Sequence, residues 1–364
     1  MSMYWSELTR RLKPYVPGEQ PRDRKFIKLN TNENPYPPSP AVIEAIQRAA
    51  GDTLRLYPDP ACTEFREAVA ERYGVKAEQV FPGNGSDEVL AFAFAAFFES
   101  SGAPILFPDI SYSFYPVYAG LWNIPYRTVP LREDFYLESG PYLGKNGGIV
   151  FPNPNAPTGM ALPLDSLREI ASAAERNKRV LLLDEAYIAF ADQEGMGPAL
   201  PLLDEFPNLL LIRTLSKEAS LAGLRAGFTL GSGELTEALC RVRDSFNSYT
   251  MDRLALAGAA AAIKDPAYYD GINRRIIATR GRVSKGLKAL GFTVLPSQAN
   301  FLFAAPPAES GKSGLEFFTA LRERGILVRH FNKPRIADFM RISIGADGDM
   351  DAFLEACGDI MSNV

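Results

Sequence analysis

The chain has 364 residues, of which 46% are apolar and 23% charged, and its net charge at pH 7 is −4. This length corresponds to about two domains, and the composition is that of a globular protein. The balance of 39 basic and 43 acidic side chains argues against a nucleic-acid partner, which would call for a basic surface.

The sequence also argues against a membrane or secreted protein. Its longest apolar run, residues 89–98, is half of the ~20 residues that a membrane-spanning helix needs. The N-terminal stretch MSMYWSELTRRLKPY is charged and has no apolar core, so we expect no signal peptide. Three widely spaced cysteines favour a reducing compartment, and we expect a cytoplasmic protein. A single histidine, His330, argues against a multi-histidine metal site, and we expect no metal.

The predicted elements begin with a proline-rich extended arm at residues 15–39, because proline and the residue before it disfavour helix. Helical stretches then alternate with short apolar runs. Helices are expected at 41–50, 64–73 and 87–98, and strands at 104–107, 148–151, 180–183, 209–212 and 227–230. Runs without polar alternation are typical of strands covered on both faces. We therefore expect an α/β large domain with a mostly parallel central sheet covered by helices.

The pattern changes beyond residue 263. A long basic helix is expected at 273–290, strands near 292–295, 299–303, 326–329 and 340–344, and a further helix at 314–324. This order predicts a smaller α+β C-terminal domain. The expected division is an N-terminal arm at 1–29, a large domain at 30–262 and a small domain at 263–364.

Polar side chains follow the predicted strands at their carboxyl ends, where α/β sheets bind ligands. Asp184 and Tyr187 follow the strand at 180–183, and Lys217 and Arg225 follow the strand at 209–212. The segment FPGNGSDE (81–88) opens a helix with two glycines. These strand ends present an acid, a lysine, an arginine and a glycine-rich helix N-terminus.

This set suits pyridoxal 5'-phosphate, which needs a lysine for its aldehyde and an acid for its ring nitrogen. A helix N-terminus with a nearby cation is a common phosphate site. Each residue has a plainer interpretation, as a solvated lysine, an N-cap or a tight turn, and only their combination favours the cofactor. A dinucleotide site is rejected, because Glu88 stands where the third glycine of G-x-G-x-x-G is needed.

Several motifs carry a more specific resemblance. They are LNTNENPY (29–36), RLYPD (55–59), GNGSDE (83–88), NPNAPTG (153–159), LDEAY (183–187), RTLSK (213–217), LAGLR (221–225) and RISIG (341–345). On these motifs the chain resembles the fold-type I pyridoxal-phosphate-dependent transferases, and among them the aminotransferases. The NENP element (32–35) and VRHF (328–331) favour the histidinol-phosphate branch of that family. The resemblance implies transamination of L-histidinol phosphate with 2-oxoglutarate, giving imidazole acetol phosphate and L-glutamate, in histidine biosynthesis.

The resemblance also implies roles in catalysis. Lys217 is expected to bond to the cofactor and to move the proton at the substrate's Cα. Asp184 is expected to stay ionised against the pyridinium, and Tyr187 to donate to the phenolate oxygen. Tyr112 resembles the aromatic residue that stacks on the cofactor ring. Tyr57 resembles the tyrosine that reaches the neighbouring subunit's phosphate, which implies a homodimer with shared active sites. The expected phosphate ligands are Gly85, Ser86, Asp87, Ser216 and Arg225.

The expected substrate residues are two arginines, a tyrosine and an asparagine. Arg341 resembles the arginine that pairs with the α-carboxylate of glutamate, where bidentate geometry favours a guanidinium. Arg329 resembles the second arginine, which serves the substrate phosphate or the distal carboxylate of glutamate. Tyr15 resembles the arm tyrosine that closes over the substrate, and Asn32 is expected in the same pocket.

One position departs from the family pattern. Aminotransferases of this type commonly have asparagine directly before the proline of Asn-Pro-x-Gly, and here that position is Ala156. Either Asn155 takes the role with a shifted backbone, or Tyr187 acts on the phenolate oxygen without it.

Alternative functions remain open at this point. One keeps the chemistry with another substrate, as an aromatic amino acid aminotransferase or a threonine-phosphate decarboxylase-like enzyme. The other is a non-catalytic, aminotransferase-like regulatory module, which predicts an attached DNA-binding domain and a basic patch.

Overall fold

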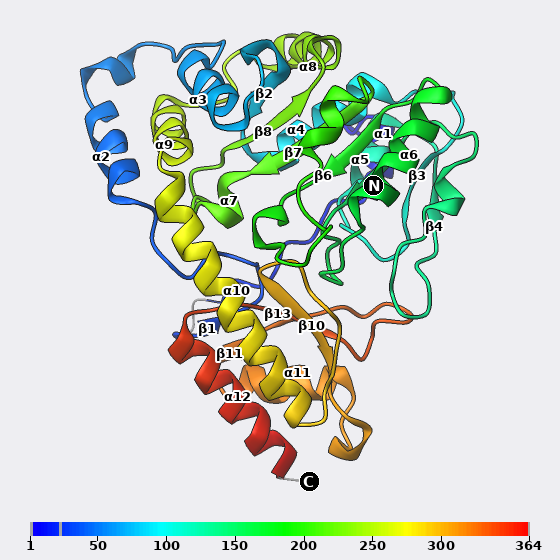
Figure 1. The fold of residues 1–364 in the computed structure, drawn as a ribbon, viewed down its shortest axis with the longest axis vertical. Coiled ribbons are helices and arrows are strands. Elements are labelled where there is room, and N and C mark those ends of the chain that lie inside the picture. Colours follow the sequence, from blue (N-terminus) through cyan, green and yellow to red (C-terminus); the bar gives the residue numbers. More distant parts are fainter. Residues whose placement is uncertain (1–2, 22–23, 363–364) are drawn as a thin grey trace.

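The computed structural model describes residues 3–21 and 24–362. Parts of the predicted arm (residues 1, 2, 22 and 23) and the last two residues of the predicted small domain lie outside this description. The molecule has an upper part built on a seven-stranded sheet and a lower part built on a four-stranded sheet (Figure 1). The chain starts in a short helix, α1 (Glu7–Arg11), capped by Ser6.

The seven-stranded sheet has the order β2-β8-β7-β6-β5-β3-β4. Its strands are β2 (Val80–Gly83), β3 (Ile105–Pro108), β4 (Tyr126–Val129), β5 (Ile149–Pro152), β6 (Leu181–Asp184), β7 (Leu209–Thr214) and β8 (Gly227–Gly231). Only β8 runs antiparallel to its neighbours, so the expected mostly parallel sheet is confirmed. The sequence did not predict β2 or β4. Pro82 and Gly83 interrupt the first, and the second is an edge strand with three exposed residues.

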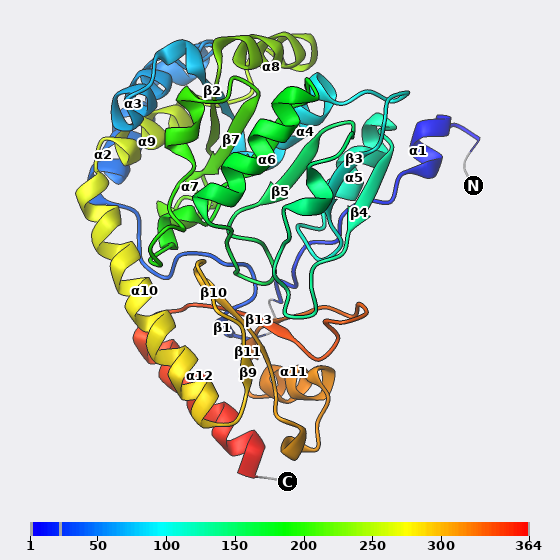
Figure 2. The same cartoon turned by 45° about the vertical axis from the view of Figure 1, so that its right-hand side comes forward.

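Helices cover both faces of this sheet, as Figure 2 shows. One layer contains α3 (Thr63–Tyr73), α6 (Leu164–Arg176) and α9 (Arg253–Ile263), with α2 (Pro40–Ala49) outside α9. The other contains α4 (Gly85–Phe97), α5 (Tyr115–Trp122) and α8 (Gly233–Phe246). Alternate residues of one strand face the two layers: Leu181 and Leu183 pack with the first, Leu182 with the second. This double burial explains the purely apolar strand sequences.

The lower part has a sheet of order β12-β13-β10-β9. Its strands are β9 (Thr293–Val294), β10 (Phe301–Ala305), β12 (Arg329–His330) and β13 (Met340–Ser343). It packs with α11 (Gly314–Glu323), α12 (Asp347–Ser362) and α10 (Pro266–Ala289), the long helix that joins the two parts. We expected α10 to start at residue 273, but it starts seven residues earlier, where Pro266 suits the first helical turn.

Two details qualify the expected boundaries. The predicted strand at 326–329 is divided into β11 (Ile326–Leu327) and β12, which belong to different sheets. The short strand β1 (Ile27–Lys28), within the predicted arm, pairs in parallel with β11. The arm is therefore tied to the lower part of the molecule, and the division into three domains stays a prediction.

Short elements complete the described chain. The four-residue helix α7 (Leu215–Glu218) follows β7 directly. Short 3-10 helices lie at Asp52–Arg55, Ala77–Gln79, Gly140–Tyr142, Ile188–Phe190, Leu200–Asp204 and Ala308–Ser310. Across residues 3–21 and 24–362, no helix has the length and apolar character needed to cross a bilayer.

Candidate active site

A pocket of about 180 Å³ lies at the carboxyl ends of β5, β6 and β7. It is the place where an α/β sheet is expected to bind its ligand. Most residues that the sequence singled out line this pocket. They are Tyr15, Asn32, Ser86, Asp87, Tyr112, Asp184, Tyr187, Ser216, Lys217, Arg225 and Arg341.

Lys217 enters the pocket from α7. Thr214 caps this short helix by accepting a hydrogen bond from the Ser216 amide, which fixes the turn between β7 and the lysine. The Lys217 ammonium donates to the Thr31 carbonyl at 2.9 Å. Burial lowers the pKa of Lys217 to about 8, and Arg341 acts in the same direction. The amine is therefore neutral, and nucleophilic, at a pH far below that of a solvated lysine.

Asp184, the last residue of β6, is buried beside the pocket. Its carboxylate accepts from the Ala186 amide at 3.1 Å and from the Tyr115 hydroxyl at 3.3 Å. Burial raises the pKa of Asp184 to about 7, and no cation of the described residues pairs with it. A buried carboxylate without a cation is costly. The position is therefore ready for a positively charged ligand atom.

The start of α4 forms an anion cradle with Arg225. The first N–H groups of a helix have no partner within the helix and favour a phosphate there. Gly85 has φ +80°, and a Cβ on it would lie 2.6 Å from Arg225 Nη2. On β8, a Cβ on Gly227 would lie 2.6 Å from the Ser86 amide nitrogen. Arg225 also pairs with Asp87 at 3.2 Å. Because Gly85 and Gly227 have no Cβ, β8, the start of α4 and the Arg225 guanidinium can approach one another closely at the cradle.

Two tyrosines line the pocket with fixed hydroxyl groups. Tyr112 donates to Asp87 Oδ1 at 2.7 Å. The Tyr187 hydroxyl accepts from Asn32 Nδ2 at 3.0 Å, and the Asn32 backbone amide donates to Ser343 Oγ at 2.8 Å. Asn32 thereby connects the N-terminal segment with β6 and β13. It also has a positive φ of 56°, a conformation that asparagine tolerates better than most residues.

A smaller cavity of about 40 Å³ shares part of its lining with the pocket. Tyr15, Tyr112 and Arg341 line both, whereas Arg329 lines only the smaller one. Arg341 donates to the Asn30 carbonyl at 2.9 Å, and its buried Nε has no partner among the described residues. Burial lowers the pKa of Arg341, and Arg329 adds to this effect. The two guanidiniums therefore form a region that favours anions.

Some predicted residues lie elsewhere. Asn155 does not line the pocket: its amide donates to the Ile110 carbonyl and to Thr158 Oγ1, each at 3.0 Å, and its side chain borders a separate cavity. Ala156 lines the pocket instead, so the departure from the family pattern leaves no asparagine at that point. Gly85 shapes the cradle without lining the pocket. Tyr57 is 78% exposed and stacks on Tyr249, away from this chain's own pocket.

The sequence analysis missed several contributors. Thr31 acts through its backbone carbonyl, which no side-chain pattern reveals. Tyr115 supports Asp184 but lies in the aromatic segment YSFYPVY (112–118), where the sequence gives no means of choosing among tyrosines. Thr214 was detectable in principle, as a threonine directly before a short helix is a common N-cap.

The donor set fits pyridoxal 5'-phosphate. The buried Asp184 suits a protonated ring nitrogen, Lys217 suits an aldehyde, and the cradle of Ser86 and Arg225 suits a phosphate. No group of three or more His, Cys, Asp or Glu within the described part of the chain could hold a metal ion.

Comparisons with known proteins agree with this geometry. A family model described as aminotransferase class I and II matches residues 24–360. Histidinol-phosphate aminotransferase 1 of Bordetella parapertussis is 54% identical over the full length of both chains, and the Clostridium acetobutylicum enzyme is 51% identical over 98% of each. A similar solved structure is that of histidinol-phosphate aminotransferase from Sinorhizobium meliloti in complex with pyridoxal-5'-phosphate. It superposes with a TM-score of 0.86 at 26% sequence identity, and the match covers 100% of this chain and 99% of that one.

Proposed function

The chain belongs to the class I and II aminotransferases, and we propose that it transfers the amino group of L-histidinol phosphate to 2-oxoglutarate. The cofactor is pyridoxal 5'-phosphate and the reaction serves histidine biosynthesis. The observation that carries the substrate assignment is that Arg341 lines both the Lys217 pocket and the adjoining cavity that Arg329 lines. The full-length relatives that bear this enzyme's name support it.

The cofactor, when bound, supplies an aldehyde for the amino group and a protonated ring that withdraws electrons from the substrate's Cα. Lys217 is the residue that would hold that aldehyde, and its neutral amine would be the base for the Cα proton. Its lowered pKa suits both tasks. Asp184 holds the proton on the ring nitrogen, and the α4 cradle with Ser216 and Arg225 holds the phosphate. Tyr187 would donate to the phenolate oxygen of the cofactor, and Tyr112 would stack on its ring.

One pocket has to accept two kinds of anion. Histidinol phosphate brings a phosphate but no carboxylate, whereas glutamate brings two carboxylates. Arg329 and Arg341 lie on neighbouring strands and face each other in register, β12 against β13. Each guanidinium can pair with either anion, and Tyr15, which stacks on Phe114 at 4.7 Å, closes the pocket from the arm. Asn32 completes the substrate side.

A homodimer completes the site in this proposal. Large apolar side chains are exposed beside Tyr57, namely Leu54 and Leu56 in the same segment and Tyr249, which stacks on it. Such a patch is typical of an interaction surface. We place the Tyr57 hydroxyl at the phosphate of the partner subunit. We also place the enzyme in the cytoplasm, since Cys62, Cys240 and Cys357 are free thiols.

The test is a half-reaction. The purified holoenzyme is mixed with a single amino donor, and the change in cofactor absorbance is followed. We expect histidinol phosphate and glutamate to convert the cofactor, with phenylalanine slower. A wild-type preference for phenylalanine over histidinol phosphate would replace the proposal by an aromatic aminotransferase.

A further inference from the structure

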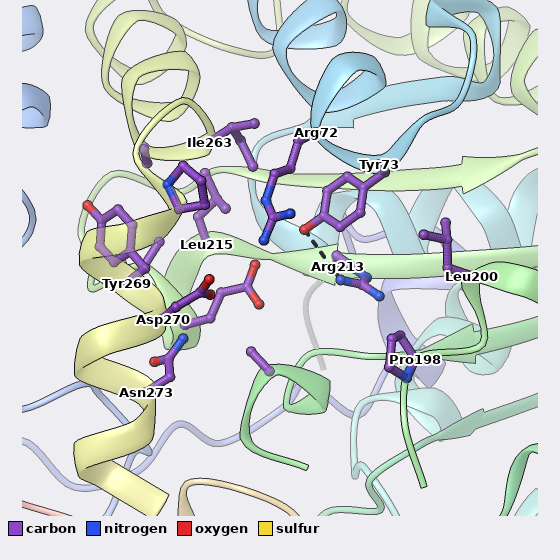
Figure 3. A pocket seen from close by; sticks show the side chains of 15 residues that line it. Arg72, Tyr73, Pro198, Leu200, Arg213, Leu215, Ile263, Tyr269, Asp270 and Asn273 are labelled. Carbon is purple, nitrogen blue, oxygen red and sulfur yellow. Dashed lines mark hydrogen bonds between the residues drawn. The ribbon is translucent and has the colours of Figure 1, made fainter. Parts of the chain in front are cut away.

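A second cavity, of about 330 Å³, is lined by α7 residues other than Lys217, and Figure 3 shows the side chains around it. It is bounded by the end of α3, the end of β7, α7 and the first turns of α10. Lys217 lines the active-site pocket and Glu218, the next residue, lines this cavity. We call it the rear cavity. Its volume lies in the range of small-molecule sites.

The rear cavity contains charged groups that the protein itself leaves unpaired. Neither Glu218 nor Arg72 forms a hydrogen bond or ion pair with any residue in the described part of the chain. Burial raises the pKa of Glu218, and Arg213 and Arg72 oppose this effect, so both cations act on its carboxylate. Figure 3 shows Arg72 reaching from α3 into the cavity, towards Asp270 on α10. Arg72 is exposed and Glu218 is half-buried, so both groups can be reached from solution by a ligand of opposite charge.

Arg213 does not add to this unpaired set. Its Nε and Nη2 donate to Glu185 Oε2 at 3.0 and 2.7 Å, and its Nη1 donates to the Tyr73 hydroxyl at 3.3 Å. In the described part of the chain, the charged groups of the rear cavity without an ion pair are one cation, Arg72, and two anions, Glu218 and Asp270, of which Arg72 and Asp270 are exposed. Leu215 and Ile263 add an apolar wall. A ligand that satisfies this arrangement carries one carboxylate, one ammonium group and an apolar portion.

We propose that the rear cavity is a second binding site, for a free α-amino acid in its zwitterionic form. Its carboxylate pairs with Arg72, and its ammonium group with Glu218 and Asp270. The side chain packs on Leu215. This site goes beyond the proposed transamination, which uses only the pocket of Lys217. Because Glu218 follows Lys217 within one helical turn, occupancy of the rear cavity stabilises α7 and thereby the position of the lysine.

The test measures binding and needs no turnover, so its failure is separate from a failure of the proposed function. Holoenzyme treated with sodium borohydride, which fixes the cofactor on Lys217, is titrated calorimetrically with L-leucine, L-histidine and L-glutamate. n-Butylamine and butyrate serve as probes with one charge each. We expect at least one amino acid to bind once per chain, and more tightly than either probe. Arg72→Gln and Glu218→Gln should each weaken that binding about tenfold or more.

Two controls locate the site. Glu71→Gln removes an exposed carboxylate next to Arg72 that does not line the rear cavity, and it should leave the affinity unchanged. Arg341→Ala disables the active-site pocket, and binding to the rear cavity should survive it. Arg72 is exposed, so its substitution tests the proposal even if Glu218→Gln fails to fold. The proposal is overturned if no amino acid binds, if the Arg72 variant binds normally, or if Arg341→Ala abolishes binding.

Discussion

Replacing Asp184 by asparagine is expected to affect the cofactor-free protein and the holoenzyme in opposite directions. In the cofactor-free protein the carboxylate is buried without a cation, and its pKa rises from an ordinary 3.8 to about 7. Below pH ~4 the group is protonated in both folded and unfolded chains and has no effect. As the pH rises towards 7, the unfolded chain loses this proton first, so the folded state becomes progressively less stable.

The magnitude follows from the difference between the two pKa values. At about 1.4 kcal/mol for each pKa unit, the cost levels off above pH 7 at roughly 4 kcal/mol. Asparagine keeps the shape: its Oδ1 can still accept from the Ala186 amide, and its Nδ2 can donate to the Tyr115 hydroxyl in place of the second carboxylate oxygen. The cofactor-free Asp184→Asn protein should therefore exceed wild type in stability at pH 8. Its affinity for the cofactor should fall about 10- to 150-fold, since one charge-assisted hydrogen bond contributes ~1.5–3 kcal/mol.

The assay is urea unfolding of both cofactor-free proteins between pH 5 and 9, together with cofactor titration. The informative quantity is the difference in unfolding free energy between variant and wild type, because other titrating groups cancel in it. Asp204→Asn, at an exposed position, is the matched control for the substitution itself. A variant that is less stable than wild type at pH 8, or a difference that does not change with pH, refutes the reasoning.

Four further predictions concern the remaining residues. Lys217→Ala should abolish transamination while circular dichroism shows a folded protein; near-wild-type turnover would contradict the site. Arg329→Ala should lower the specificity constant for histidinol phosphate by roughly 10- to 150-fold and that for phenylalanine much less, so an equal loss for both donors speaks against the anion role. Glu185→Met and Arg213→Met should each destabilise the fold by about 3–5 kcal/mol in urea unfolding, because each leaves one charge of a buried ion pair without its partner; the side chains are 0% and 7% exposed. The double variant should be less destabilised than either single variant, because it leaves no unpaired buried charge. Heterodimers of a Tyr57→Phe chain with a Lys217→Ala chain should regain activity over the two homodimers, and proven heterodimers without that gain would place Tyr57 in its own subunit's site.

Much of the fold was predictable because the central strands are buried on both faces. The strands at 148–151, 180–183 and 209–212 have no polar alternation, and β5, β6 and β7 are indeed fully buried. β4 escaped prediction because an edge strand lacks this signal. The split between β11 and β12 escaped it because pairing partners, rather than local sequence, decide where a short strand ends.

The candidate site likewise has parts that the local sequence predicts and parts that depend on distant segments. Side chains at strand ends, such as Asp184 and Lys217, were found because topology brings parallel strand ends together. Backbone contributions such as the Thr31 carbonyl could not be found, as they depend on how a distant segment folds back. Asn155 shows the limit of motif reasoning. Its position one residue away from the family pattern turns its amide towards Ile110 rather than into the pocket.

The order in which the chain contributes to the pocket has a consequence for its synthesis. The phosphate cradle, Asp184, Lys217 and Arg225 all lie before residue 226, whereas Arg341 comes near the end of the chain. A growing chain on the ribosome therefore completes the cofactor's binding groups well before its substrate clamp. The hydrogen-bond partner of Asn32, Ser343, emerges more than three hundred residues after it. Chains that stop short of β13 should thus retain the groups that hold the cofactor while lacking those that select an amino donor.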